Sequence, residues 1–218
     1  MPRSPPVFSA FAARRRRALA ILGCALAGTA ALPLRAQKSL RPTPAQTEGP
    51  FYPRTIPADR DADLTVVAGH GTPAQGTRLY FGGRVVTRDG SAQSAATVEL
   101  WQCDVFGRYH HAGDDGSPRD DGFQGYGVAI TDAEGRYAFK TIRPVAYSGR
   151  VPHLHLRVKT AGGATLTTQV YIAGDRTDGD PVLAWSSKGT REQLTMVLAA
   201  APGADAGTLA GDFDIVLP

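Results

Sequence analysis

The chain has 218 residues, of which 42% are hydrophobic and 25 are glycine. This length can bury one good hydrophobic core, so we expect a single folded domain. A formal charge of +4 would favour nucleic acid as a partner, but residues 1–36 hold six of the 24 basic residues and no acidic ones. The remaining 18 basic and 20 acidic residues give a net charge of −2, which excludes an electrostatic attraction for phosphate backbones.

Residues 1–36 have the organisation of an export signal. Arg14 to Arg17 form a basic run, an apolar stretch extends from Ala18 to Leu34, and a small-residue cleavage site ends at Ala36. Because Pro33 interrupts an apolar stretch rich in alanine and glycine, we expect no stable membrane span after cleavage. We predict a periplasmic or extracellular protein, exported by the Sec route or by the twin-arginine route.

Export also limits the chemistry of the two cysteines. Acylation at Cys24, as in a lipoprotein, fits less well, because only a few apolar residues precede this position. After cleavage at Ala36 the mature chain keeps one cysteine, Cys103, so it can form no intrachain disulfide. Cys103 lies in a predicted strand, where a lone cysteine is more often a small buried apolar side chain than a metal ligand.

The mature chain shows strand patterns and no helical periodicity of useful length. Residues 37–63, rich in Pro and Thr, predict an extended N-terminal arm, and a domain of residues 64–218 follows. The long segment 104–125 predicts a functional or mobile loop. Alternating runs separated by turn residues predict an all-β fold, an antiparallel β-sandwich of about eight strands. The predicted strands are 79–87, 97–103, 126–131, 136–142, 153–160, 166–173, 194–199 and 213–217.

The strand from residue 153 carries two histidines at alternate positions. Polar and apolar residues alternate strictly over 152–158, which is typical of a half-buried strand with one face in the core. His153 and His155 therefore point to the same side, separated by roughly 6.6 Å along the backbone. From that spacing both rings can converge on one atom, while the apolar residues between them face the core.

Five motifs then occur in order along the mature chain. They are Thr47-Glu48-Gly49-Pro50-Phe51-Tyr52-Pro53, Val98 to Asp104 with Gly107-Arg108-Tyr109, Tyr137 to Pro144, Tyr147 with Gly149 to His155, and Thr168-Gln169-Val170-Tyr171. Together they resemble the intradiol ring-cleavage dioxygenases, in an exported, single-domain branch of proteins like protocatechuate and catechol dioxygenases. The similarity covers most of the mature chain.

The resemblance implies a β-sandwich that holds Fe(III) and cleaves catechols, with O₂, between their two hydroxyls. It implies a non-haem enzyme that inserts both oxygen atoms and gives a muconate-type diacid. Arg150 matches an arginine that stabilises charge developing on the substrate, and Gln169 matches a glutamine lining the pocket. The implied metal ligands are Tyr109, Tyr147, His153 and His155.

These residue types suit the implied chemistry. Ferric iron is a hard ion that favours anionic oxygen ligands, and imidazole also suits iron. Phenolate supplies the oxygen, because a bound cation lowers the pKa of a phenol from its free value of about 10. A fixed cation such as Arg150 would stabilise negative charge in a poorly hydrated pocket.

Several tyrosines and histidines have simpler interpretations. Gly-Arg-Tyr occurs twice, and we favour Tyr109 over Tyr137 because Tyr109 follows the strand that contains Trp101. We expect His110 and His111 to be solvated loop residues and His70 to be exposed. The remaining tyrosines are expected to be half-buried packing residues with hydroxyls in water, namely Tyr52, Tyr80, Tyr126 and Tyr171.

Other functions remain as alternatives. A secreted β-sandwich binding module, or a degenerate non-catalytic subunit, would use the same fold without turnover. A zinc hydrolase fits less well, because catalytic zinc prefers three His, Glu or Cys ligands. The link of five residues between Tyr147 and His153 is shorter than in the better-studied branches, which favours a bulkier catecholic substrate. The sequence leaves a homo-oligomer open.

Overall fold

The computed structural model describes residues 39–114, 116–177 and 179–218. The predicted export signal of residues 1–36, with Cys24, lies outside the described residues. Within the described part of the chain, no helix combines the length and apolar character needed to cross a membrane.

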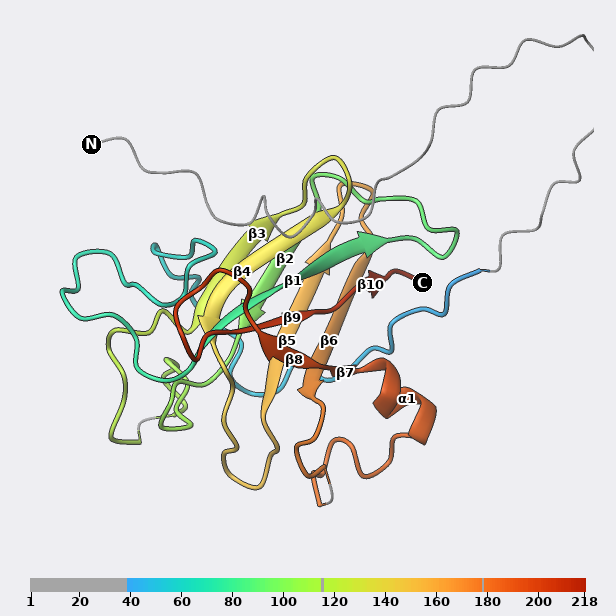
Figure 1. Ribbon diagram of the computed structural model, residues 1–218. Helices are drawn as coiled ribbons and strands as arrows, with labels where there is room; N and C mark the ends of the chain where they lie inside the picture. Colours follow the sequence, from blue (N-terminus) through green and yellow to red (C-terminus); the bar gives the residue numbers. More distant parts are fainter. Residues whose placement is uncertain (1–38, 115, 178) are drawn as a thin grey trace, which may run out of the picture. The chain divides into compact units, whose positions relative to one another are not determined.

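Two five-stranded sheets form the fold, which confirms the all-β prediction (Figure 1). In the first sheet the order is β10-β1-β9-β8, and β4 also pairs with β1. Its strands are β1 (Arg78–Val86), β4 (Arg136–Ile142), β8 (Leu198–Ala200), β9 (Leu209–Asp212) and β10 (Ile215–Val216). In the second sheet the order is β3-β2-β5-β6-β7. Its strands are β2 (Thr97–Trp101), β3 (Tyr126–Ile130), β5 (His153–Lys159), β6 (Thr165–Ile172) and β7 (Thr195–Met196).

Most strand pairs are antiparallel, as predicted, but β9 and β10 run parallel to β1, and β7 runs parallel to β6. Strand β9 was not predicted, because Leu-Ala-Gly-Asp lacks β-branched and aromatic residues. A side chain at Gly211 would displace its neighbours, since a Cβ there would lie 2.5 Å from the sulfur of Met196. The described residues also include one short helix, α1 (Lys188–Gln193), which is too short to show a helical period.

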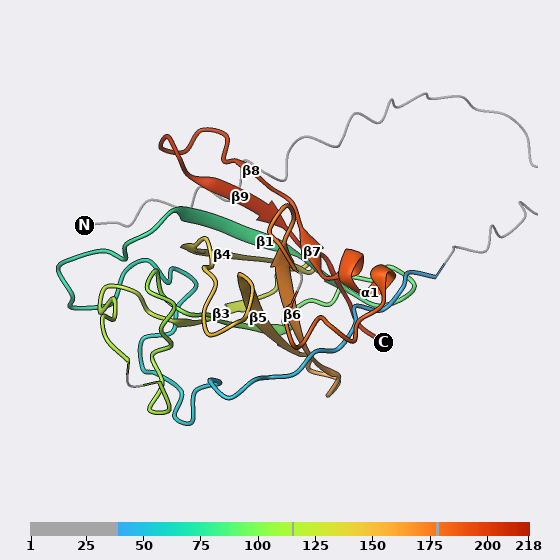
Figure 2. The same ribbon diagram turned by 90° about the horizontal axis from the view of Figure 1, so that it is seen from below.

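The hydrophobic core lies between the two sheets (Figure 2). Alternate residues of β2 and β5 point into it and meet the aromatic residues of β1 and β4. Burying each such side chain contributes roughly 1.5–3 kcal/mol. Residues with at most 1% exposure include Val98, Leu100, Leu154, Leu156, Phe81 and Phe139.

The other face of the second sheet carries the polar and aromatic residues. Trp101 pairs with His155, and His155 pairs with Gln169, so these three side chains share that face. A second buried cluster with Trp101 forms there, and Phe51 and Tyr52 of the arm pack against it.

The N-terminal arm covers this outer face. Its backbone follows the edge of β6, where the Gln46 N–H donates to the Thr167 carbonyl over 2.9 Å. Figure 2 shows the arm, in blue, on the side of β5 and β6 away from β1 and β9. Because of this cover, His153 and His155 are only 1% and 2% exposed. The prediction of a half-buried strand was therefore wrong for residues 153–156 of β5, which are buried on both faces, but it holds farther along, where Arg157 is half-buried and Lys159 is exposed.

Candidate metal centre

The two strand histidines meet at their outer nitrogens. The Nε2 atoms of His153 and His155 lie 3.1 Å apart, and the Nδ1 of His153 lies 2.6 Å from the Val151 carbonyl oxygen. Because a carbonyl can only accept, we assign the proton of His153 to Nδ1, which leaves a lone pair on Nε2. Burial, with the nearby Arg150 cation, lowers the pKa of His153 to about 4. Burial, with His153 and Arg150, likewise lowers the pKa of His155 well below its usual value. Both imidazoles are thus neutral and able to bind a cation at neutral pH.

His155 is held in place by the sheet and by the arm. The Trp101 ring stacks on its imidazole, with ring centroids 4.9 Å apart and an interplanar angle of 13°. Gly49 approaches from the arm with φ +72°, and a Cβ at that position would lie 3.3 Å from Cε1 of His155. A side chain at Gly49 would be strained and would crowd the imidazole, which explains the glycine in the Thr47–Pro53 motif.

Tyr147 reaches the histidines from a tight turn. Its hydroxyl lies 3.5 Å from Nε2 of His153. The turn is closed by two backbone hydrogen bonds between Tyr147 and Arg150, of 3.1 and 2.7 Å. Its central residues, Ser148 and Gly149, have φ values of +42° and +76°, as a type I′ turn requires. This turn puts the Tyr147 phenol and the Arg150 guanidinium at opposite ends of four residues.

Tyr109 is supplied by the long loop after β2. The buried Asp104 carboxylate organises the loop by accepting the backbone N–H groups of Phe106, Arg108 and Asp120 over 2.8–3.0 Å. Gly107 lets this loop approach Tyr147 closely, since a Cβ added at position 107 would lie 3.0 Å from Cβ of Tyr147. The loop predicted at 104–125 is therefore well braced where it carries a site residue.

The two tyrosine rings lie edge to face, with centroids 5.2 Å apart. Tyr109 is 2% exposed, and its buried hydroxyl makes no hydrogen bond of normal geometry within the described residues. Burial, followed by the nearby Tyr147 phenol, raises the pKa of Tyr109 well above its usual value. Burial also raises the pKa of Tyr147, while Tyr109 and Arg150 act in the opposite direction.

This donor set fits a ferric ion. Two neutral imidazoles meet the Tyr147 hydroxyl, and the ring of Tyr109 packs beside Tyr147 and His155 with its hydroxyl buried and without a partner in the described chain. An unpartnered buried hydroxyl is costly, and a trivalent cation would convert both phenols into anionic ligands. Among the described residues there is no group of three or more His, Cys, Asp or Glu that could hold a metal. The zinc alternative therefore has no ligand set in this part of the chain.

Arg150 stands beside the donor set and is fixed by a hydrogen-bond network. Its Nη2 donates to Gln169 Oε1 over 2.6 Å and lies 3.3 Å from the Tyr171 hydroxyl. The Tyr171 hydroxyl donates to the same Gln169 oxygen over 2.9 Å, and Gln169 Nε2 donates to the Thr47 carbonyl over 2.8 Å. Gln169 is fully buried, so it supports Arg150 and ties the arm to the site.

Comparison with known proteins gives the family. A family model described as "Dioxygenase" matches residues 47–218. The protocatechuate 3,4-dioxygenase beta chain of Burkholderia cepacia is 35% identical over 167 residues, which is 72% of this chain and 71% of that protein. The chain belongs to the intradiol ring-cleavage dioxygenases. The resemblance stated from the sequence motifs is thereby confirmed.

Other relatives of this dioxygenase differ in length. A catechol 1,2-dioxygenase of Candida albicans is 30% identical over 143 residues, but the match covers 57% of this chain and 45% of that protein. The chain thus spans about half the length of that relative. A solved dioxygenase domain from Streptomyces sp. SirexAA-E, part of a carbohydrate-binding protein fusion, is 28% identical with a TM-score of 0.61. That match covers 81% of this chain and 98% of the domain.

The structure corrects several expectations about side chains of the dioxygenase. Tyr126 is 3% exposed rather than half-buried, and the half-buried Tyr52 donates its hydroxyl to Glu99 over 2.8 Å rather than to water. Tyr171 is 1% exposed and belongs to the Arg150 network, so it is not a half-buried packing residue. His110 and His111 are half-buried rather than solvated. Nε2 of His110 lies 3.7 Å from the buried Asp104 carboxylate, and Nδ1 of His111 accepts the Gly113 N–H over 2.9 Å. The acidic Asp104, six residues before His110, was the signal in the sequence that could have indicated a partner.

Other expectations are confirmed. Cys103 is 1% exposed and packs with Trp101, with its sulfur 3.7 Å from the Val145 carbonyl oxygen. Tyr137 lies in the core, and its hydroxyl donates to the Phe213 carbonyl over 2.6 Å, far from any ligand role. His70 is exposed.

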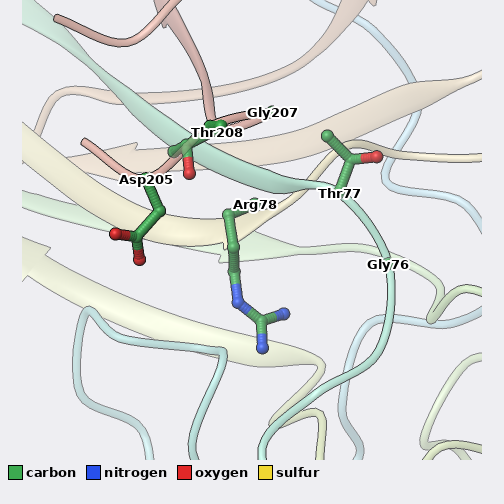
Figure 3. A pocket seen from close by; sticks show the side chains of 7 residues that line it. Gly76, Thr77, Arg78, Asp205, Gly207 and Thr208 are labelled. Atoms are coloured by element: carbon green, nitrogen blue, oxygen red, sulfur yellow. The ribbon is translucent and has the colours of Figure 1, made fainter.

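A pocket elsewhere on the dioxygenase is separate from the candidate metal centre (Figure 3). This open pocket of about 440 Å³ lies between the start of β1 and the turn that joins β8 to β9. Arg78, Asp205 and Thr208 are among its lining residues, and all of its lining residues lie outside the Tyr and His donor set. The histidines of the donor set lie on β5 of the other sheet, and its tyrosines lie on loops.

Proposed function

We propose that this protein is a non-haem Fe(III) intradiol dioxygenase that inserts both atoms of O₂ into a catecholic ring between its two hydroxyls. The product would be a muconate-type diacid. The observation that carries the proposal is the meeting of two imidazoles and two phenols beside a braced guanidinium, in a chain of this family. His153, His155, Tyr109 and Tyr147 would hold the iron.

Fe(III) held by these four residues would supply Lewis acidity that activates a catechol toward O₂. The two phenols would then have different roles, because their surroundings differ. Tyr109 is 2% exposed and is packed under Phe51, with ring centroids 4.7 Å apart, so it would stay fixed. Tyr147 is half-buried on a turn, so its oxygen can take up a proton from a catechol hydroxyl as the substrate enters.

Arg150 would stabilise negative charge on the substrate. Its side chain is 12% exposed, and its Nε and Nη2 are used by protein partners. Within the described residues no hydrogen bond uses its Nη1, which therefore can donate to a substrate oxygen. A cation held in place before the substrate arrives stabilises developing negative charge more than a mobile one, because it needs no reorganisation during the reaction.

The substrate is proposed to be larger than unsubstituted catechol. The link between Tyr147 and His153 is a tight turn, and a Cβ at Gly149 would meet no atom within 4 Å. Ser148 and Gly149 are both exposed, so this side of the site has room for a substituent. The name of the Streptomyces relative refers to a cellulolytic bacterium, which supports a plant-derived aromatic as the substrate class. A panel of catechols showing strong preference for unsubstituted catechol would contradict this assignment.

Export is the remaining part of the proposal. Residues 1–36 have a basic run, an apolar stretch and a cleavage motif, and they would place the enzyme in the periplasm or outside the cell. N-terminal sequencing of the protein recovered from the periplasmic or culture fraction tests this. We expect a chain that begins at Gln37, and a full-length chain in the cytoplasmic fraction would contradict export.

The reaction is tested with iron-loaded protein. A ferric tyrosinate centre should give a reddish-brown colour, and oxygen uptake with a catechol panel should yield products heavier by two oxygen atoms. Mass measurement with ¹⁸O₂ distinguishes insertion of both atoms from insertion of one. A colourless, folded protein that takes up no iron would instead favour a non-catalytic binding module.

A further inference from the structure

A buried carboxylate, not included in the predicted site, lies against Arg150. Asp180 follows β6 and is fully buried. Its Oδ2 accepts the Arg150 Nε–H over 2.9 Å and the Val151 backbone N–H over 3.0 Å. Its Oδ1 accepts the backbone N–H groups of Val182 and Leu183 over 2.9 and 3.1 Å. All four contacts come from donors, which is the surrounding that an ionised carboxylate needs when it is buried.

The balance of these contacts keeps Asp180 charged. Burial by itself raises the pKa of a carboxyl, but the hydrogen bonds from Val151, Arg150 and Leu183, with the guanidinium charge, lower the pKa of Asp180 overall. Asp180 and Arg150 thus form a buried ion pair of opposite charges. Removing one member of such a pair leaves the other uncompensated, so the pair acts as a unit.

The contacts of Arg150 define the plane of its guanidinium. Asp180 holds Nε, and Gln169 and Tyr171 hold Nη2. Contacts on two sides of a planar, rigid fork leave it little freedom to rotate. The orientation that results leaves Nη1 without a protein partner among the described residues, on a side chain that is 12% exposed.

We propose that Asp180 is a positioning residue for ring cleavage, which orients Arg150 so that Nη1 can bind the oxygen of a catecholic substrate. The proposal rests on the proposed function of the site. Asp180 is also linked to His153 by hydrogen bonds of the Val151 backbone. The same Oδ2 holds the N–H of Val151, and the carbonyl of Val151 accepts Nδ1–H of His153 over 2.6 Å. One carboxylate therefore fixes both the guanidinium and the peptide segment that orients a histidine.

The segment that carries Asp180 is itself anchored. Leu183 is 1% exposed and belongs to the hydrophobic core, and the Ala184 N–H donates to the Asp180 carbonyl over 2.9 Å. The carboxylate is thus attached to the core rather than to a free loop. A rigid support is what precise positioning of a substrate-binding group needs.

The test substitutes Asp180→Asn in the full-length protein loaded with iron. An amide cannot accept from all four donors, because one of its two polar atoms is itself a donor. We expect the affinity for 4-methylcatechol, titrated without oxygen by the shift of the charge-transfer band, to fall about 10- to 100-fold, and kcat/KM to fall with it. The charge-transfer band of the substrate-free protein should be retained.

Asp175→Asn is the matched control. Asp175 lies five residues earlier and pairs with Arg143 over 2.6 and 2.9 Å, so it also forms an ion pair with an arginine. It makes no contact with the donor set or Arg150 among the described residues, and we expect catechol affinity within twofold of the unaltered protein. An equal loss in both variants would show that any broken ion pair has this effect, which would overturn the specific role of Asp180.

A double-mutant cycle separates positioning from general stability. If Asp180 acts through Arg150, the losses of catechol affinity caused by Arg150→Gln and Asp180→Asn should not multiply. The double variant should then bind catechol about as weakly as Arg150→Gln alone. If the two losses multiply fully, Asp180 does not act through Arg150. Should Asp180→Asn fail to fold, Asp180→Glu takes its place in the cycle, with a smaller expected loss because the charge is kept.

A further readout requires neither iron nor substrate. The Arg150 Nε–H should give a slowly exchanging ¹⁵N–¹H signal in the metal-free protein, which Asp180→Asn shifts and Asp175→Asn leaves in place. An unchanged signal and unchanged catechol affinity would overturn the inference. If the iron-loaded protein binds catechols without consuming oxygen, the proposed function fails, while binding and the Nε–H signal still test the role of Asp180.

Discussion

The two halves of the candidate metal centre are built differently. His153 and His155 lie on β5, which is bonded on both sides by β2 and β6. Tyr109 and Tyr147 lie on loops that meet only through tertiary contacts, including the close approach at Gly107. The strand half is therefore a fixed base. In the loop half the buried Tyr109 is also held in place, whereas Tyr147, half-buried on its turn, can adjust. This difference suits a site that must keep a metal while one ligand takes part in proton transfer.

Removing a strand ligand should have the largest effect. We expect His155→Ala to lose most bound iron and at least about 100-fold in kcat/KM, because the remaining donors cannot replace a fixed imidazole. Iron content by atomic absorption and oxygen uptake measure this. The control is His70→Ala, an exposed histidine, which should retain both iron and activity. Full iron content in His155→Ala would show that the strand half is not the fixed base.

Removing the adjustable phenol should affect turnover more than iron retention. We expect Tyr147→Phe to lose or strongly shift the visible charge-transfer band and to lose about 100-fold in kcat, while much of the iron remains. The absorption spectrum and stopped-flow rates measure these effects. Tyr137→Phe, which loses a buried hydrogen bond to Phe213, should instead cost about 1 kcal/mol of stability with an unchanged spectrum. An unchanged spectrum in Tyr147→Phe would reject Tyr147 as a ligand.

Lowering the pH should destabilise the folded, metal-free protein through the two histidines of the strand half. The pKa of His153 falls from its ordinary value of 6.5 to about 4 on folding, chiefly because of burial, and that of His155 also falls. Between these pH values the unfolded chain binds more protons, so the stability of the metal-free protein should decrease as the pH falls from 6.5 to 4. For His153 alone the loss approaches roughly 3 kcal/mol. Urea unfolding at several pH values measures it, and a flat profile over this range would contradict neutral buried histidines.

The smallest expected effect concerns the contact between the two loops. In the Gly107→Ala variant the alanine would have to adopt φ +74°, and its Cβ would lie 3.0 Å from Cβ of Tyr147. Gly163→Ala is the control, since it has φ +85° but no neighbouring atom within 4 Å. We expect about 1 kcal/mol of strain in both and up to about 1 kcal/mol more for Gly107→Ala, with a shifted charge-transfer band only there. Equal unfolding energies and spectra would show that the loop contact does not position Tyr147.

The same difference decides what the sequence could predict. The histidine pair could be located because alternation along one strand is a local signal. The pairing of Arg150 with Asp180 spans 30 residues and leaves no local pattern, so it required the structure. Tyr171 was misassigned for a related reason, since its hydroxyl contacts Arg150 of the turn before β5 and Gln46 of the arm. The iron-binding roles of the four site residues stay predictions.

The arm has a consequence for how the protein matures. The contact between Thr47 and Gln169 joins residues 122 positions apart, so the wall beside the histidines can be completed only after β6 has left the ribosome. The arm, although synthesised before all of the strands, is thus among the last segments to dock. A chain halted before residue 169 would have both tyrosines and both histidines but would lack the Gln169 contact of the arm, and we expect metal uptake to follow synthesis of β6.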